Sequence, residues 1–322
     1  MTASVLIHVG LDLVGDGLMK LPFIRALRAA FPDARITWLA GQGQSAFAGT
    51  LAPLVAGLLD EVVAEDPAAF ARRCRAAGQR FDVVLDTQRG FLTALRLRRI
   101  PHRRFISPAL AFLLSSERPR AYRKPPLLAA QLMDLASLTA GAPVQPQGGF
   151  TIPAAAAAEA TALLPAGPHY VGLAPGAGSR HKCWPLEHFI RLGGQLAQEG
   201  KAPVFILGPA EQDWADTVRA ALPEALLPLQ AARTADVVLT LAVGARLASA
   251  VANDAGVGHL LAAAGTPLVS LFGPTPPAKF APWATRARIV RAQDFGSDSM
   301  DAIPIEAVQA ALAALDGDGA DS

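Results

Sequence analysis

The residues whose types and spacing can do chemistry are most concentrated between positions 251 and 275. An apolar stretch typical of a buried strand ends at Asp254, and the small residues Ala255 and Gly256 then begin a predicted helix. The free backbone N–H groups at the start of such a helix attract an anion. His259 falls in the first turn, so a pyrophosphate and a ribose are what this site would hold. The alternative is an ordinary strand–helix turn, with Asp254 as the helix cap and His259 on the surface.

Strands that alternate with helices must position this site. In the first half, strands are predicted at 5–9, 35–40, 61–64 and 81–86, and the helix after a Gly-containing turn has apolar residues at three- and four-residue spacing, with Pro22 near its first turn. In the second half, strands are predicted at 170–174, 203–207, 248–252 and 268–272, and helices at 185–199, 211–221 and 257–264. This alternation predicts an α/β fold with a parallel sheet in each half.

Because each half opens with a strand, a Gly-containing turn and a helix, the sequence predicts two Rossmann-like domains with a ligand cleft between them. The expected domains are residues 1–160 and 161–322, with the segment 141–149 leading to the linker. The last helix, 305–315, is expected to pack back on the first domain, and the tail from residue 316 is expected to be disordered.

Composition narrows the function classes. The chain has 322 residues, 52% of them hydrophobic, and a net charge of +2, which argues against general nucleic-acid binding. Cys74 and Cys183 give no metal-binding spacing, which suits a reducing cytoplasm. The apolar stretch 5–9 has no preceding basic residue and resembles a first strand rather than a signal peptide, and Pro, Gly and Gln interrupt the charge-free stretch 135–157, so no membrane span is expected.

Five ordered segments together resemble glycosyltransferase family 9, the ADP-heptose:lipopolysaccharide heptosyltransferases. The resemblance rests on N-D-A-G-V-G-H and F-G-P-T in 253–275, on P-G-A-G-S-R-H-K-C-W-P in 175–185, on G-P-A-E in 208–211, on the opening G-D-G-L-M-K-L-P in 15–22 and on F-D-V-V-L-D-T-Q in 81–88. It implies a GT-B architecture and an inverting transfer of a heptose-like sugar from an ADP-sugar to a lipopolysaccharide inner-core or related surface-glycan acceptor.

By position, the resemblance assigns roles to residues in both halves. Asp16 corresponds to the catalytic base, which takes the proton of the acceptor hydroxyl; Asp12 is a rival base, and Asp16 as a mere helix cap is the structural alternative. Lys182 would neutralise the leaving diphosphate, or be only a solvated loop lysine. The donor-binding residues implied in this way are Gly176, Ser179, Lys182, Glu211, Asp254, Ala255, Gly256 and His259.

No cofactor and no metal are expected, since the only D-x-D pair lies at Asp316 and Asp318 in the tail. Lys182, the helix start and His259 would take the place of a divalent ion. Trp184 is expected in the core rather than against a ligand.

A basic segment from Arg96 to Lys124 has nine Arg or Lys residues and one acid, Glu117. It would attract an anionic glycolipid or glycan acceptor, or contact the cytoplasmic face of the inner membrane peripherally; a solvated helix face and loop is the alternative. The acceptor candidates are Arg89, Arg96, Arg98, Arg99, Arg120 and Arg123.

Departures from the family pattern leave the exact sugar and acceptor open. Ala177, Gly178 and Ala255 stand where hydroxyl residues are common, so another donor or acceptor within the family is an alternative. Two further alternatives are a non-catalytic nucleotide-sugar-binding protein and an NAD-dependent dehydrogenase, although no clean G-x-G-x-x-G follows the first strand. The sequence does not indicate the oligomeric state.

Overall fold

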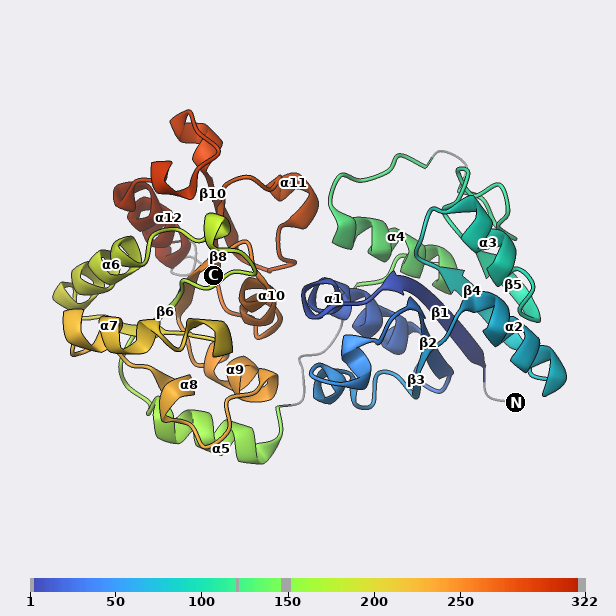
Figure 1. The fold of residues 1–322 in the computed structure, drawn as a ribbon, viewed down its shortest axis with the longest axis horizontal. Coiled ribbons are helices and arrows are strands. Elements are labelled where there is room, and N and C mark those ends of the chain that lie inside the picture. Colours follow the sequence, from blue (N-terminus) through green and yellow to red (C-terminus); the bar gives the residue numbers. More distant parts are fainter. Residues whose placement is uncertain (1–2, 120–121, 146–151, 318–322) are drawn as a thin grey trace. The chain divides into compact units, whose positions relative to one another are not determined.

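The computed structural model describes residues 3–119, 122–145 and 152–317, and the chain divides into two compact units, Met1–Gly148 and Gly149–Ser322 (Figure 1). The division precedes the expected boundary at residue 160, which falls inside helix α5 (Ala154–Leu163). Ala160 and Leu164 pack with Leu239 and Val243 of the second unit, so α5 belongs to that unit.

The first unit contains a five-stranded sheet in the order β3-β2-β1-β4-β5, and every pair is parallel. The strands are β1 (Ser4–Leu11), β2 (Arg35–Gln42), β3 (Glu61–Ala64), β4 (Phe81–Asp86) and β5 (His102–Ile106). The order reverses between β1 and β4. Ligands of doubly wound sheets bind at the carboxyl ends of the strands beside such a reversal.

The helices of the first unit are α1 (Val14–Ala30), α2 (Pro67–Ala76), α3 (Phe91–Leu97) and α4 (Leu128–Ala140), with the short 3₁₀ helices η1 (Ala46–Ala48) and η2 (Ala52–Val55). Helix α1 packs beside α4, and α2 beside α3. The position of Pro22 differs from the prediction, because α1 begins at Val14 and Pro22 lies in its interior, where it has no N–H to donate.

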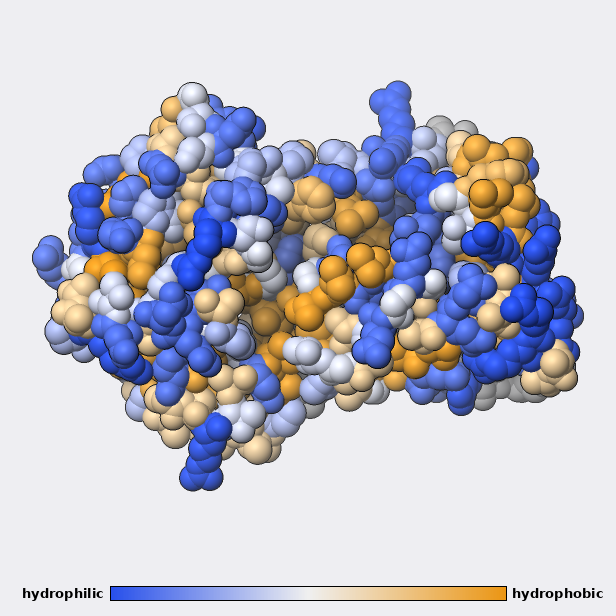
Figure 2. All heavy atoms as spheres, viewed as in Figure 1, coloured by the Kyte–Doolittle hydropathy of each residue, from blue (hydrophilic) through white to orange (hydrophobic). Residues whose placement is uncertain are grey.

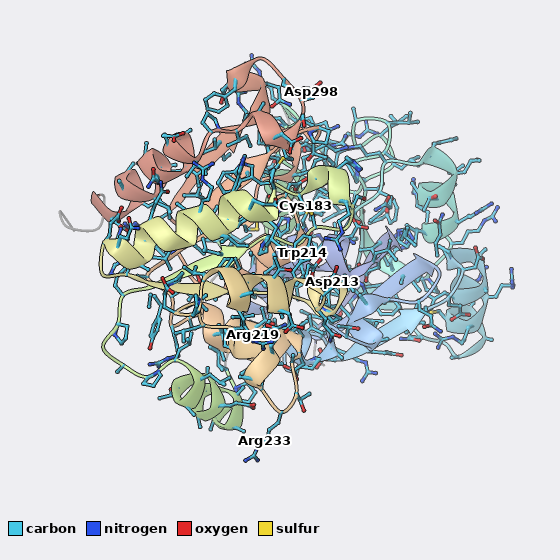
Figure 3. The ribbon with its side chains drawn as sticks, turned by 60° about the vertical axis from the view of Figure 1, so that its left-hand side comes forward. Cys183, Asp213, Trp214, Arg219, Arg233 and Asp298 are labelled. Atoms are coloured by element: carbon cyan, nitrogen blue, oxygen red, sulfur yellow. The ribbon has the colours of Figure 1, made fainter. Side chains whose placement is uncertain are left out.

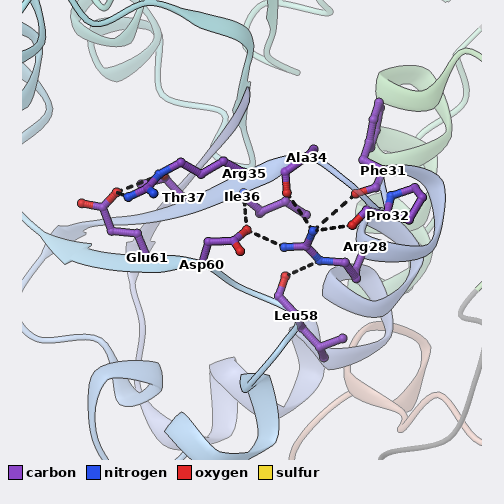
Figure 4. Close-up of polar contacts among 10 residues, drawn as sticks. All are labelled: Arg28, Phe31, Pro32, Ala34, Arg35, Ile36, Thr37, Leu58, Asp60 and Glu61. Carbon is purple, nitrogen blue, oxygen red and sulfur yellow. Dashed lines mark hydrogen bonds and ion pairs between the residues drawn. The ribbon is translucent and has the colours of Figure 1, made fainter. Parts of the chain in front are cut away.

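Arg28 fastens the end of α1 to the sheet (Figure 4). Its guanidinium donates to the carbonyls of Leu58 at 3.0 Å and Ala34 at 2.7 Å, and to Asp60 Oδ2 at 2.5 Å. The same Asp60 oxygen accepts from the backbone N–H of Ile36, at 2.7 Å. One side chain therefore fixes α1 relative to β2 and to the segment before β3.

The second unit has its own parallel sheet, in the order β10-β9-β8-β6-β7. Its strands are β6 (Tyr170–Ala174), β7 (Ala202–Phe205), β8 (Ser249–Asn253), β9 (Leu268–Phe272) and β10 (Ala287–Arg291). The order reverses between β6 and β8. The turns that follow these two strands are therefore the expected ligand-binding turns.

The other helices of this unit are α6 (Leu186–Gln198), α7 (Trp214–Ala221), α8 (Pro228–Ala231), α9 (Val237–Gly244), α10 (Gly256–Ala263), α11 (Pro277–Phe280) and α12 (Ile305–Gly317), with 3₁₀ helices η3 (Arg180–Lys182), η4 (Pro209–Glu211), η5 (Ala292–Phe295) and η6 (Met300–Ala302). The packing of α12 corrects the prediction that it returns to the first domain. Its buried Val308, Leu312 and Leu315 join the core formed around α6 and β9 of the second unit. The tail residues 318–322 lie outside the described residues.

Candidate functional site

Asn253, at the end of β8, joins the two turns that follow β6 and β8. Its side-chain amide donates to the carbonyl of Pro175 at 2.7 Å, and its Oδ1 accepts the backbone N–H of Trp184 at 3.1 Å. The residue is buried, so both bonds form away from water, where they are costly to lose. Asn253 thus fixes the loop 175–184 against the start of α10.

Lys182, Asp254 and Thr275 converge at this edge of the sheet. Lys182 Nζ lies 3.3 Å from Asp254 Oδ2, and the Thr275 hydroxyl donates to the same oxygen at 2.5 Å. The Lys182 side chain retains 29% of its exposure and that of Asp254 only 11%. The three residues come from three separate turns, and the sequence motifs included Thr275 without giving it a role. Lys182 is therefore a half-buried, oriented cation rather than a solvated loop lysine.

Helix α10 begins without a side-chain cap. Ala255 is its N-cap residue and makes no capping hydrogen bond, whereas Asp254 bonds to Lys182 and Thr275. The alternative in which Asp254 caps this helix is therefore wrong. The first-turn N–H groups, from Gly256 onward, have no capping carboxylate or hydroxyl, which suits an anion at this position.

His259, in the first turn of α10, is neutral at neutral pH. Burial lowers its pKa from 6.5 to about 4, and the nearby Asp254 carboxylate opposes this shift only in part. A neutral imidazole can donate or accept a hydrogen bond but supplies no positive charge. Lys182 and the helix start therefore carry the positive potential at this site, and His259 adds no charge to it.

Glu211, in η4, lies over the backbone of Gly176. Its Oε2 accepts the N–H of Gly208 at 3.1 Å, and a Cβ on Gly176 would lie only 2.6 to 2.9 Å from the carboxyl atoms of Glu211. Gly176 is therefore required for this close approach. Burial raises the pKa of Glu211, while the Gly208 N–H and the charge of Arg180 oppose this shift.

The remaining residues of the loop differ in exposure. Ser179 is exposed and caps no backbone N–H with its side chain. Its carbonyl lies 3.7 Å from the Cys183 sulfur, and burial raises the pKa of that thiol. Arg180 stacks over Trp214 at 4.2 Å, next to Asp213; Figure 3 labels Cys183, Asp213 and Trp214. Trp184 is fully buried and donates to the carbonyl of Ile303, so its prediction as a core residue is confirmed.

In the first unit, Asp16 lies in the first turn of α1, at the carboxyl end of β1. The side chain is half-buried, and no residue of the described chain makes a hydrogen bond or ion pair with it. The N-cap of α1 is Leu13 rather than Asp16. The carboxylate is therefore free to accept a proton from a bound molecule.

Asp12, the rival candidate for the base, is buried, and both of its carboxylate oxygens accept hydrogen bonds. Its Oδ1 accepts from Lys20 Nζ at 2.8 Å, while its Oδ2 accepts from the Trp38 indole at 2.9 Å and from the Ser45 hydroxyl at 2.5 Å. Three donors and full burial leave this carboxylate no path to a substrate. Asp12 is a structural residue that fixes the turn between β1 and α1.

A second buried network, absent from the sequence predictions, joins the ends of β1, β4 and β5. His8 Nδ1 lies 2.9 Å from Asp86 Oδ1, and the Ser107 hydroxyl donates to Asp86 Oδ2 at 2.8 Å. The N–H of Gln88 donates to Oδ1 at 2.9 Å. The signal in the sequence is one polar residue within or just after each of three strands: His8 in β1, Asp86 at the end of β4 and Ser107 after β5.

The acceptor candidates follow β4 and β5. Arg96, Arg98 and Arg99 are exposed, and no ion pair or hydrogen bond links their side chains to other described residues, whereas Arg89 donates to Gln131 at 3.3 Å. Arg123 is also exposed, and Arg120 lies outside the described residues. Within the described ranges, no group of three or more His, Cys, Asp or Glu residues could hold a metal, and no helix is long and apolar enough to cross a membrane.

Comparison with known proteins identifies the family. The sequence model of "Glycosyltransferase family 9 (heptosyltransferase)" matches residues 69–302. This chain belongs to glycosyltransferase family 9. The matched range contains Lys182, Glu211 and His259, and it ends beyond Thr275.

Individual relatives match shorter segments. The lipooligosaccharide heptosyltransferase 2 of Haemophilus influenzae is 34% identical over 41% of this chain, and the lipopolysaccharide heptosyltransferase 2 of Escherichia coli is 32% identical over 38%. The chain spans 38% and 36% of the lengths of these two relatives.

Solved structures resemble the whole chain in fold. A family 9 glycosyltransferase from Veillonella parvula has a TM-score of 0.74 at 19% identity, covering 98% of this chain and 97% of its own. The E. coli ADP-heptose heptosyltransferase II has a TM-score of 0.66 at 22% identity, covering 97% of this chain and 98% of its own. The prediction of two Rossmann-like domains of the GT-B class is confirmed.

Proposed function

We propose that this protein is an inverting, metal-independent glycosyltransferase that transfers a heptose-like sugar from an ADP-sugar to a lipopolysaccharide inner-core or related surface-glycan acceptor. The observation that carries the proposal is the convergence of Lys182, Asp254 and Thr275 at the uncapped start of α10. Family membership and the matched heptosyltransferases of H. influenzae and E. coli support it.

In the proposed mechanism, the diphosphate of the donor lies at the N-terminus of α10, facing its free N–H groups. Lys182 stabilises the negative charge that grows on the leaving diphosphate. Neutral His259 donates or accepts a hydrogen bond there, and Glu211 contacts the nucleoside. As the acceptor oxygen bonds to the anomeric carbon, the bond to the diphosphate breaks and its electron pair leaves with ADP.

Asp16 acts as the general base in this proposal, because it is half-buried and free of partners while Asp12 is fully bonded. It takes the proton from the acceptor hydroxyl as that oxygen attacks. The exposed Arg96, Arg98 and Arg99 attract an anionic acceptor from the cytoplasmic side of a membrane.

Ala255 favours a second candidate donor. In the family pattern a hydroxyl residue is common at this position, and Ala255 offers only its backbone. Another ADP-sugar, with a different pattern of hydroxyl groups, is therefore the alternative within the same reaction type.

A calorimetric screen of ADP, UDP, GDP, their sugars and NADH tests the proposal. ADP and ADP-sugars are expected to bind most tightly, and transfer of the sugar is expected to survive EDTA. Preference for NADH would refute the proposal as a whole. Strict dependence of transfer on added Mg²⁺ would refute its metal-independent part.

A further inference from the structure

Helix α3 of the first unit is apolar on its outer face as well as on its inner face. Ala94 and Leu97 are buried, while Phe91, Leu92 and Leu95 remain 43%, 67% and 38% exposed. A helix on a protein surface normally turns polar residues to the solvent. The outer face of α3 therefore has the composition of a surface that becomes buried from water in some state of the protein.

The segment after β5 presents two more leucines, Leu110 at 54% and Leu113 at 50% exposure. Leu110, Ala111 and Phe112 have φ values of 47°, 50° and 65°, which L residues other than Asn and Asp rarely adopt. Asn or Gly would relieve this backbone cost, yet the chain places a leucine here. Strain that is retained at an exposed residue favours a function for that residue.

Hydrogen bonds between Ser107 and Ser115 connect the two ends of this strained segment. The backbone N–H of Ser107 donates to the Ser115 hydroxyl, which in turn donates to the Ser107 carbonyl, both at 2.8 Å. Phe112 is buried against Tyr122, at a ring distance of 5.0 Å. The turn therefore presents Leu110 and Leu113 on a fixed base rather than on a loose loop.

The two groups of apolar residues are neighbours. They follow β4 and β5, which are adjacent strands, and the inner residues Ala94, Leu97 and Ala109 belong to one core cluster. Figure 2 shows hydrophobic atoms gathered over this part of the first unit, next to strongly hydrophilic ones. We name this area the apolar tip; it consists of Phe91, Leu92, Leu95, Leu110 and Leu113.

Positive charge borders the apolar tip. Arg96, Arg98 and Arg99 extend along α3 and beyond it, and Arg118 donates to the carbonyl of Leu113 at 2.6 Å. The acid of this region, Glu117, is paired with Arg104 at 2.6 Å. Leucine and phenylalanine edged by arginine match the interface of an anionic bilayer. A second copy of this face would meet it with the same charge, which opposes self-association.

We propose that the apolar tip inserts into the headgroup region of an anionic phospholipid bilayer and that the bordering arginines contact lipid phosphates. The tip follows the carboxyl ends of β4 and β5, and Asp16 follows that of β1, so both lie at one edge of a parallel sheet. The role of this contact rests on the proposed function. A first unit bound to the membrane would bring Asp16, the proposed base, to an acceptor that is itself anchored in lipid. The contact itself does not depend on that function.

Sedimentation of the full chain with vesicles of phosphatidylglycerol, and with vesicles of phosphatidylcholine alone, tests the proposal. The wild type is expected to bind the anionic vesicles. The double variant Leu110→Asn/Leu113→Asn is expected to bind them at least about tenfold more weakly. It should keep its melting temperature, because Asn accepts a positive φ at position 110. The control is Ile289→Asn/Phe295→Asn, which changes two apolar residues of the second unit that are 44% and 40% exposed.

The charge requirement is tested separately. Arg96→Gln/Arg99→Gln is expected to weaken binding to phosphatidylglycerol vesicles, and Arg72→Gln/Arg75→Gln on α2 is the control. Equal binding by Leu110→Asn/Leu113→Asn and the wild type, or no binding by the wild type, would overturn the proposal. The proposal would also be overturned if the wild type formed a concentration-dependent dimer and Leu110→Asn/Leu113→Asn did not. Vesicle binding without any sugar transfer would refute the proposed function alone.

Discussion

At the scale of single residues, two carboxylates four positions apart have different surroundings in the first unit. Asp12 is buried beneath three hydrogen-bond donors, and Asp16 has none among the described residues. The chain between them turns from a strand into a helix, and Asp12 is buried while Asp16 is half-buried. The choice of Asp16 as the proposed base therefore rests on burial and hydrogen bonding, which spacing alone does not reveal.

Substitution of each carboxylate by its amide separates these roles. Asp16→Asn is expected to reduce transfer by a factor of ~10²–10⁴ and to change unfolding free energy by less than about 1 kcal/mol. Asp12→Asn leaves the buried Lys20 cation without its counter-charge, so we expect a loss of about 3–5 kcal/mol in stability. Sugar transfer and urea unfolding measure the two effects. Asp33→Asn, at an exposed position, is the control, and a stable Asp12→Asn protein would contradict this account.

Burial of His259 makes the free energy of unfolding decrease as the pH falls. Its pKa is about 4 in the folded protein and near 6.5 when unfolded, so the unfolded state binds the extra proton between these values. Its contribution is complete above pH 6.5 and is lost as the pH falls toward 4, amounting to ~3 kcal/mol. On acidification the unfolding free energy of the wild type should therefore fall relative to that of His259→Gln, by about this amount. Parallel pH curves for the two proteins would disprove this; exposed His181→Gln is the control.

At the scale of elements, the turn after β6 depends on a contact between a glycine and a carboxylate. Gly176→Ala would place a methyl group within 2.9 Å of Glu211, which can move because it is the end of a flexible side chain. We therefore expect little change in melting temperature but roughly tenfold weaker binding of ADP-sugar, the size of one lost contact to a charged group. Gly178→Ala is the matched control, because a Cβ there meets nothing within 4 Å. Equal affinity of both variants would separate Glu211 from the donor site.

The elements also show what the sequence could and could not predict. Strand and helix periodicity predicted the parallel sheets. The family resemblance assigned Lys182 and Asp254 to one donor site, and the structure places Lys182 Nζ 3.3 Å from Asp254 Oδ2. The sequence did not predict that Asn253 would fix the loop 175–184 against the start of α10, because its partners are backbone groups far along the chain. It also did not predict the lowered pKa of His259, because burial depends on packing that no local pattern contains.

At the scale of the whole molecule, the two units differ in strand order as well as in residues. Renumbered from its own first strand, the second sheet has the order 5-4-3-1-2, while the first has 3-2-1-4-5. The sequence predicted the same plan twice, since strand order arises from crossovers between elements. In both sheets the first strand lies beside the reversal, and the turn after it contains candidate residues: Asp16 in one unit and Lys182 in the other.

Hydrogen exchange in the presence of ADP tests the proposal that the nucleotide binds to the second unit. ADP is expected to slow exchange in the segments 175–184 and 253–260, while the turn between β1 and α1 should exchange at its free rate. The reason is that the proposed anion site consists of the N–H groups at the start of α10 and of Lys182, which all belong to the second unit. Protection confined to the first unit would place the nucleotide elsewhere.

Cys183 gives the proposed donor site a native chemical reporter. The chain has two thiols; Cys74 is buried, whereas Cys183 is half-buried and directly follows Lys182. A maleimide dye should therefore label one position without any engineered cysteine, and slowly, because burial raises the pKa of that thiol. Competition between the dye and candidate nucleotides would then rank donors by fluorescence, without the acceptor in hand.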